Sequence, residues 1–189
     1  MKTFCRWILA GALMSLILNP ALPLFAGTTP EDKLIADLSS PNEGTVSKAL
    51  LRLEKKFSSS TKAFPAARKL LADPRPMVQR KAARYLGAVH AKVDETDLKN
   101  ICALLTSEDP KTVMDGLKAL RGLEAPQAIP QILPCLKNVD PSVIRDACRT
   151  LAVLGNKDLI PNIEPLLKYA DPKVQKDAQD AIDLLKAKP

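Results

Sequence analysis

The sequence predicts an all-α protein in the form of an α-solenoid, with about five stacked two-helix units. One pattern recurs along the chain: a β-branched residue, a small residue and a large aliphatic residue, each four positions after the last. This spacing places three side chains on one face of a helix. No stretch alternates polar and apolar residues with a period of two, so no sheet is expected.

The pattern is clearest at Val143, Ala147 and Leu151, and four other segments repeat it. With Val143, the first anchors are residues 45, 78, 112, 143 and 174, so the steps along the chain are 33, 34, 31 and 31 residues. The four related triplets are Thr45, Ala49 and Leu53; Val78, Ala82 and Leu86; Thr112, Gly116 and Leu120; and Val174, Ala178 and Ile182. The small middle residue lets a neighbouring helix approach, so these faces are expected to pack inward.

Asp-Pro pairs stand ahead of three of these helices, at Asp109, Asp140 and Asp171. An Asp side chain can cap free N–H groups of the first turn, and Pro fits the first helical position without losing a hydrogen bond. Each pair therefore predicts a helix start. Pro76 is expected to start a helix without an adjoining Asp, and Gly155 to end one.

A second set of helices is predicted between the first, over residues 61–72, 95–107, 125–138 and 157–170. In the last two, Pro130 aligns with Pro161 near the helix start, whereas Pro134 and Pro165 lie further in and should bend the helix. Residues 30–40 are expected to form an unpaired helix that caps the N-terminal end. The helix that starts at Pro172 should form a polar cap at the other end.

The stretch "DPSVIRDACRTLAVLGNKDLIPNIEPLLK" resembles HEAT repeats, particularly the short phycobilisome-lyase-like kind. The residues that carry the resemblance are Asp140, Val143, Arg145, Ala147, Leu151, Gly155, Ile160, Pro161 and Leu166. The resemblance implies a helical solenoid that binds other macromolecules, with the second helices lining its concave side. Met114 and Ser47 occupy the Arg145 position in two repeats, so no continuous Arg ladder is expected there.

The first 26 residues have the order of a secretory signal peptide. Lys2 and Arg6 precede an apolar run from Trp7 to Leu18, and the small residue Ala26 follows Pro20 and Pro23. The run is shorter than the roughly 20 residues of a membrane span. We therefore expect cleavage after Ala26, a HEAT-repeat domain over residues 27–189, and export to the periplasm or another extracytoplasmic compartment. An uncleaved N-terminal anchor is the alternative.

Cys102, Cys135 and Cys148 remain after that cleavage. An odd number of cysteines cannot form a complete disulfide framework, and each lies in an apolar helical pattern. Buried free thiols are expected, and a disulfide between Cys135 and Cys148 is the alternative.

Basic residues gather in one part of the chain. The segment from Lys48 to Lys92 holds twelve Lys or Arg residues and two acids, Glu54 and Asp73, for a net charge of +10. We call it the basic block. A basic helical surface attracts an acidic protein, an anionic membrane surface or an anionic envelope polymer. The alternative is that these are ordinary solvated helix faces.

Candidate binding residues follow from the basic block and the predicted second helices: Lys62, Arg68, Lys69, Arg80, Arg84 and Lys99. Arg80 and Arg84 are four apart and should share a helix face. The favoured hypothesis is an exported, non-catalytic scaffold that binds a protein on the concave surface. The alternative is a factor associated with a membrane surface or an anionic polymer.

No catalytic or metal-binding pattern is recognisable. The sequence has one histidine, His90, which suits a surface or capping role, and it lacks a Gly-rich phosphate loop, H-E-x-x-H and C-x-x-C. We therefore expect no enzyme activity and no cofactor or metal. A lyase or enzyme accessory role follows from the family resemblance alone. Nucleic acid is not expected as a partner, because the signal peptide directs the chain away from it and few aromatic residues lie in the basic block.

Overall fold

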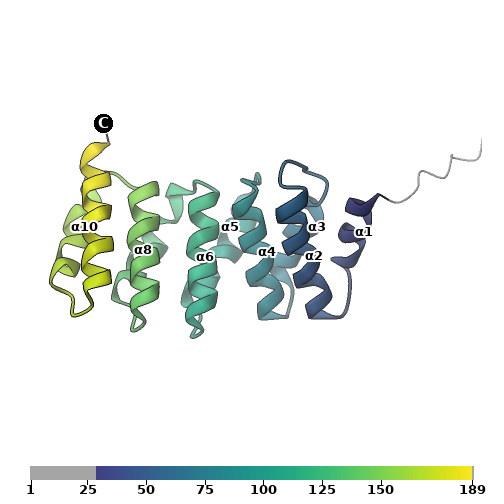
Figure 1. Cartoon of the computed structure of the whole chain (residues 1–189), viewed down its shortest axis with the longest axis horizontal. Coiled ribbons are helices and arrows are strands. Elements are labelled where there is room, and N and C mark those ends of the chain that lie inside the picture. The colour runs from purple at the N-terminus through teal and green to yellow at the C-terminus, as the bar shows by residue number, and fades with distance from the viewer. Residues whose placement is uncertain (1–28, 189) are drawn as a thin grey trace, which may run out of the picture.

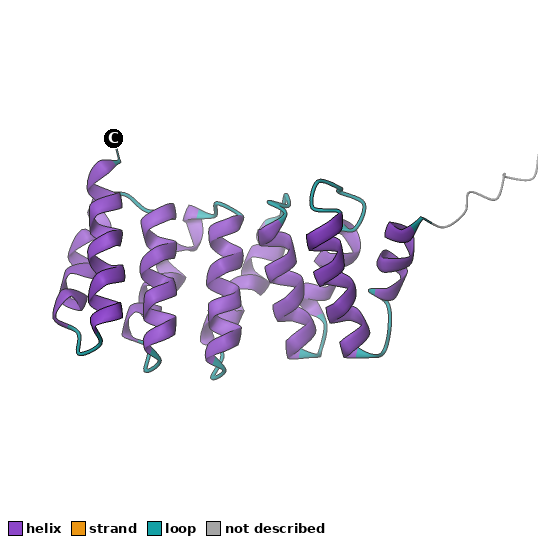
Figure 2. Cartoon of the chain, viewed as in Figure 1, coloured by secondary structure: helices purple, strands orange, loops and turns teal. Residues whose placement is uncertain are grey.

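A computed structural model describes residues 29–188, which form one row of helices in two layers (Figure 1). All regular elements over these residues are helical (Figure 2). None of the described helices is long and apolar enough to cross a membrane. The predicted signal peptide lies outside the described residues.

Five long helices lie side by side and form one layer, in the order of the sequence (Figure 1). They are α2 (Glu43–Lys56), α4 (Pro76–Ala88), α6 (Pro110–Gly122), α8 (Pro141–Leu154) and α10 (Pro172–Ala187). We call this the long-helix layer.

Shorter segments form the second layer, which we call the short-helix layer. Its members are α1 (Pro30–Asp37); α3 (Phe64–Lys69) with η1 (Leu70–Ala72); α5 (Glu95–Ala103) with η2 (Leu104–Thr106); η3 (Pro126–Ala128), α7 (Ile129–Ile132) and η4 (Leu133–Lys137); and η5 (Lys157–Leu159), α9 (Ile160–Ile163) and η6 (Glu164–Lys168). The elements labelled η are 3₁₀ helices.

Each long helix packs against the short segment that precedes it in the chain, so the described residues form five short–long pairs. This confirms an all-α solenoid of about five two-helix units. The prediction that residues 30–40 form an unpaired cap is wrong in one respect, because α1 packs on α2 and completes the first pair.

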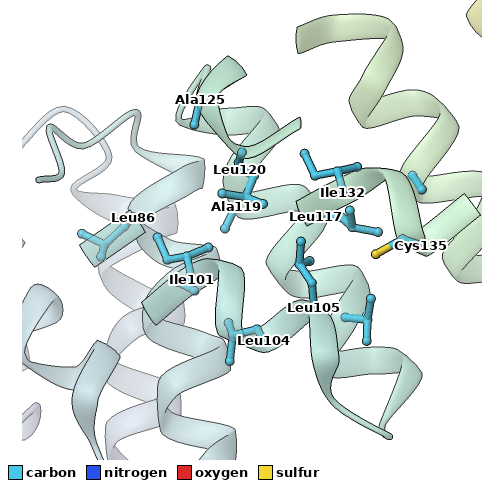
Figure 3. Packing of buried hydrophobic residues seen from close by; sticks show 14 of the residues in the cluster. Leu86, Ile101, Leu104, Leu105, Leu117, Ala119, Leu120, Ala125, Ile132 and Cys135 are labelled. Carbon is cyan, nitrogen blue, oxygen red and sulfur yellow. The ribbon is translucent and has the colours of Figure 1, made fainter. Parts of the chain in front are cut away.

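The repeated anchors form the core between the layers. All of them are buried except Thr45, which is half-buried. The next residue, Val46, is buried in its stead. In the middle of the row, Leu86, Ile101 and Leu120 come from α4, α5 and α6 and meet in one continuous core (Figure 3). The hydrophobic effect of burying these stripes requires neighbouring units, because one helical pair alone would leave its stripe in water.

The predicted helix starts are present. Asp109, Asp140 and Asp171 are N-caps, and the side chain of each accepts a hydrogen bond from the backbone N–H two residues later. Pro76 is the first residue of α4, and Gly155 is the C-cap of α8.

The inner prolines have a larger effect than a bend. Pro134 and Pro165 lie in the 3₁₀ helices η4 and η6, which follow α-helical segments of only four residues each. Proline removes a backbone donor and clashes with the preceding turn, so the α-helix does not continue through it.

Candidate binding surface

A ladder of ion pairs crosses the long-helix layer. It uses the residue immediately before the small anchor of each unit, which is Asp115 in α6, Asp146 in α8 and Asp177 in α10. All three carboxylates are buried. Each carboxylate forms ion pairs with basic side chains of the preceding long helix, so the ladder joins successive units.

The basic side of each rung comes from one position in the repeat, two residues before the large aliphatic anchor. Arg84 Nη1 lies 3.8 Å from Asp115 Oδ1, Lys118 Nζ lies 3.4 Å from Asp146 Oδ2, and Arg149 Nη2 lies 3.0 Å from Asp177 Oδ1. These residues stand three positions after the ladder position of their own helices.

A second basic position joins the ladder in two units. Arg145 Nε lies 2.5 Å from Asp177 Oδ2. Arg80 Nε lies 3.2 Å from Asp115 Oδ2, although its N–H is not aligned for a hydrogen bond. Met114 holds this position in α6 and Ser47 holds it in α2. The expected interruption of an Arg ladder through the Arg145 position is therefore confirmed. In α6, which has Met114 at that position, Lys118 forms the ion pair with Asp146.

Burial and hydrogen bonding have opposite effects on the carboxylate of Asp177. Burial raises its pKa, but hydrogen bonds from Arg145 and Arg149, with the charges of both, outweigh burial and hold the pKa below the usual value of 3.8. Asp177 is therefore a permanently charged acceptor at neutral pH.

The ladder stops at the first junction of the row. The ladder position is Lys48 in α2 and Lys81 in α4, and the two basic positions of α2 are Ser47 and Leu51. Lys81 reaches the next unit instead, with its Nζ 3.8 Å from Asp115 Oδ2. Asp115 thus serves three cations, Arg80, Lys81 and Arg84.

A groove of about 320 Å³ lies between α2 and α4 at this junction. Its lining residues are Ser47, Lys48, Leu50, Leu51, Glu54, Lys81 and Arg84. We call it the α2–α4 groove. It combines three cations, one carboxylate and an exposed leucine, Leu51, which is 45% accessible.

The six predicted binding residues divide between the two layers. Arg80 and Arg84 lie on α4, where both reach Asp115, as their spacing predicted. The other four lie on or beside the short-helix layer. The structure therefore does not bring all six into one site.

Two of these four residues hold neighbouring units together. Arg68 on α3 binds Asp94 and Asp97 at the start of α5. Lys62 lies 3.7 Å from Glu31 on α1. Lys69 and Lys99 are exposed and form no ion pair within residues 29–188.

The long-helix layer is the more closely packed of the two layers. Neighbouring long helices contact one another along the row, whereas neighbouring short segments make few contacts. Grooves separate the short segments, for example where Pro130 and Pro134 face Asn162 and Pro165.

Cys102, Cys135 and Cys148 are free thiols in the structure. Cys135 and Cys148 are buried as expected, whereas Cys102 is half-buried. Burial raises the pKa of Cys135 to about 11 and that of Cys148 to about 12. Thiols with such values are protonated at neutral pH and react slowly.

His90 caps a helix end. It is exposed and has a positive φ of 50°, two residues after the last residue of α4. The next N–H, of Ala91, donates to the Leu86 carbonyl at 3.0 Å. This is the geometry of a Schellman-type C-terminus. The part of the chain that the structure describes has no group of three His, Cys, Asp or Glu residues able to hold a metal ion.

The ladder was readable in the sequence but was not predicted. Aligning the repeats on their small anchors shows Lys48, Lys81, Asp115, Asp146 and Asp177 in one column. The charge in that column changes from positive in the first two repeats to negative in the last three, and this change is the sequence signal for the ladder. What the column contacts depends on how the units stack, which the alignment does not contain.

No protein-family model and no curated protein matches this sequence. Solved structures do resemble it. The complex of CpcE and CpcF of phycocyanin lyase from Nostoc sp. has a TM-score of 0.71 and 22% identity, and the match covers 90% of this chain and 71% of that chain.

Two designed proteins are also similar. A designed armadillo repeat protein in complex with the peptide (KR)4 has a TM-score of 0.64 and 19% identity, covering 80% of each chain. An engineered protein has a TM-score of 0.62 and 24% identity, covering 82% of this chain and 81% of that one. These likenesses show the fold, a helical-repeat solenoid of the HEAT and armadillo kind.

Proposed function

We propose that this chain, which has the fold of HEAT-like helical-repeat solenoids, is an exported, non-catalytic module that binds a protein partner on its long-helix layer. Such a layer offers an extended surface of parallel helices, which repeat proteins use for binding.

The observation that carries the proposal is the ladder. The ion pairs from Arg84 to Asp115, Lys118 to Asp146 and Arg149 to Asp177 fix successive long helices side by side. Helices held in this way are already in place before a partner arrives, so binding does not have to order them, which lowers the cost of association. The complexes formed by similar folds support the same mode, since CpcE is seen with CpcF and an armadillo design with a peptide.

Site-specific photo-crosslinking tests the surface. A photoreactive residue would replace Leu51 or Val153, which are exposed on long helices, or Lys99, which is exposed on α5 of the short-helix layer. We expect a discrete protein adduct in cells from the two long-layer positions and none from Lys99. Adducts from Lys99 alone, or no discrete adduct at any position, would contradict the proposal.

Export is tested on the same protein. We expect the accumulated protein to fractionate outside the cytoplasm and to begin at Gly27, as N-terminal sequencing would show. A protein that keeps Met1 and stays in the cytoplasm would remove the export part of the proposal and leave the binding part standing.

A further inference from the structure

The first junction of the row lacks the ion pair that the other three junctions of the long-helix layer possess. At the α2–α4 junction the two donor positions are Ser47 and Leu51, and the acceptor position is Lys81. A carboxylate is therefore absent where Asp115, Asp146 and Asp177 stand in later units. The groove lies at this junction.

The charges around the groove are not balanced by the protein. Lys48 forms no ion pair within the described residues, and Lys81 and Arg84 share Asp115 at 3.8 Å each while Arg80 occupies the same carboxylate at 3.2 Å. Glu54 contributes one negative charge to the lining. Three lining cations against one lining anion leave an attraction for a further carboxylate.

The groove also has features that suit a peptide rather than a simple ion. Leu50 and the exposed Leu51 supply an apolar wall. The hydroxyl of Ser47, another lining residue, is buried and has no hydrogen-bond partner among the described residues. A buried hydroxyl without a partner costs free energy that a ligand can recover.

We infer that the α2–α4 groove binds an acidic segment of a partner protein, which supplies the missing carboxylate of the ladder. An Asp or Glu side chain of that segment pairs with Lys48, Lys81 and Arg84, and an adjacent apolar side chain packs on Leu51. This inference rests on the proposed function and specifies its partner chemistry.

The structure suggests a variant that rebuilds the rung inside the protein. Leu51→Lys with Lys81→Asp gives the first junction the same pair of residues as Lys118 and Asp146 in a later one. The double change alters the net charge by −1, because one cation is gained and one becomes an anion. Lys99→Gln, at an exposed position of the other layer, alters it equally and is the matched control.

The probe is a short fluorescein-labelled peptide of alternating Glu and Leu residues, measured by fluorescence anisotropy with the purified protein. A peptide with Gln in place of Glu is the control ligand. We expect the Glu peptide to bind at low salt, the Gln peptide to bind at least about tenfold more weakly, and added salt to weaken binding. The rebuilt rung should weaken binding of the Glu peptide by at least about tenfold, whereas Lys99→Gln should leave it unchanged.

Thermal unfolding of the double variant should match or exceed the wild type, because the new pair is internal. If that variant does not fold, Lys48→Glu at an exposed, unpaired position serves instead and should weaken the Glu peptide similarly. Wild-type affinity for the Glu peptide in either folded variant would overturn the inference. So would equal binding of the Glu and Gln peptides.

Two other anionic ligands are tested separately: phosphatidylglycerol vesicles, and inorganic polyphosphate in solution. The inference would be overturned, in favour of a membrane-surface or polymer ligand, by two results together. The protein would bind the vesicles or the polyphosphate, more weakly in the variant with the rebuilt rung, and it would not bind the Glu peptide. A crosslink from Val153 without one from Leu51 would leave the proposed function intact while removing the α2–α4 groove from it.

Discussion

Gly122 of α6 lies against the backbone of Gly87 in α4. A Cβ atom added at Gly122 would be 2.3 Å from the Gly87 carbonyl oxygen, and one added at Gly87 would be 2.5 Å from the Cα of Ala119. Both distances are far below van der Waals contact, so glycine at these two positions sets how closely α4 and α6 approach. This contact joins the two units that share Asp115.

Gly122→Ala should therefore destabilise the protein, because the methyl group meets backbone atoms that cannot rotate away. We expect a loss of about 1–3 kcal/mol in the free energy of unfolding, measured by urea denaturation. Gly44→Ala is the control, since Gly44 lies in the exposed first turn of α2 and the nearest atom to an added Cβ is the side-chain oxygen of Asn42 at 3.2 Å. Equal stability of Gly122→Ala and the wild type would show that α4 and α6 sit further apart.

Ala147→Phe should overpack the core between α8 and its neighbours. Ala147 is fully buried on the repeated face, and adding large side chains to a packed core costs about 1–3 kcal/mol. Val153→Phe, at a half-exposed position of the same helix, should change stability little. Unchanged thermal stability of Ala147→Phe would mean that this face is not the packed one.

His90→Gly should stabilise the protein. His90 and Glu124 both adopt a positive φ, of 50° and 51°, just after α4 and α6. A residue with a Cβ is strained in that conformation, so we expect a gain of about 0.5–1 kcal/mol at either position in urea denaturation. Ala88→Gly, in the last turn of α4, should instead cost about 0.5–1 kcal/mol. A loss of stability in His90→Gly would reveal a side-chain interaction that outweighs the strain.

Asp177→Asn should weaken the last rung in a pH-dependent way. The folded-state pKa of Asp177 is depressed, because the hydrogen bonds from Arg145 and Arg149 outweigh its burial. Its contribution to stability is therefore present above the unfolded pKa near 3.8 and is lost as the pH falls through the lower, folded value. We expect Asp177→Asn to cost about 1–2 kcal/mol at pH 7.

The cost of Asp177→Asn should shrink as the pH falls below about 4. Urea denaturation of both proteins across this range measures the difference. A cost that does not vary with pH would assign it to packing rather than to the charge of the carboxylate.

Local signals made much of the fold predictable. The anchors at Val143, Ala147 and Leu151 and their relatives report one helix face, and the Asp-Pro pairs report where helices start; neither depends on distant residues. The effect of Pro134 and Pro165 was underestimated, because two prolines within four residues of each other leave too few backbone hydrogen bonds for an α-helix.

The candidate surface was predictable only in part. Arg80 and Arg84 were expected on one helix face and do share Asp115, but Arg68 was expected to face a partner and instead binds Asp94 and Asp97. A net charge of +10 in one segment does not say which cations meet a carboxylate from a unit about thirty residues away.

By itself, the sequence determined the repeat, its helices and most of their ends, because periodicity and capping act within a few residues. Only the tertiary structure decided which layer is the more closely packed and where a rung of the ladder is missing. Both depend on the stacking of units, since Leu51 and Lys81 form a groove only where α2 lies beside α4.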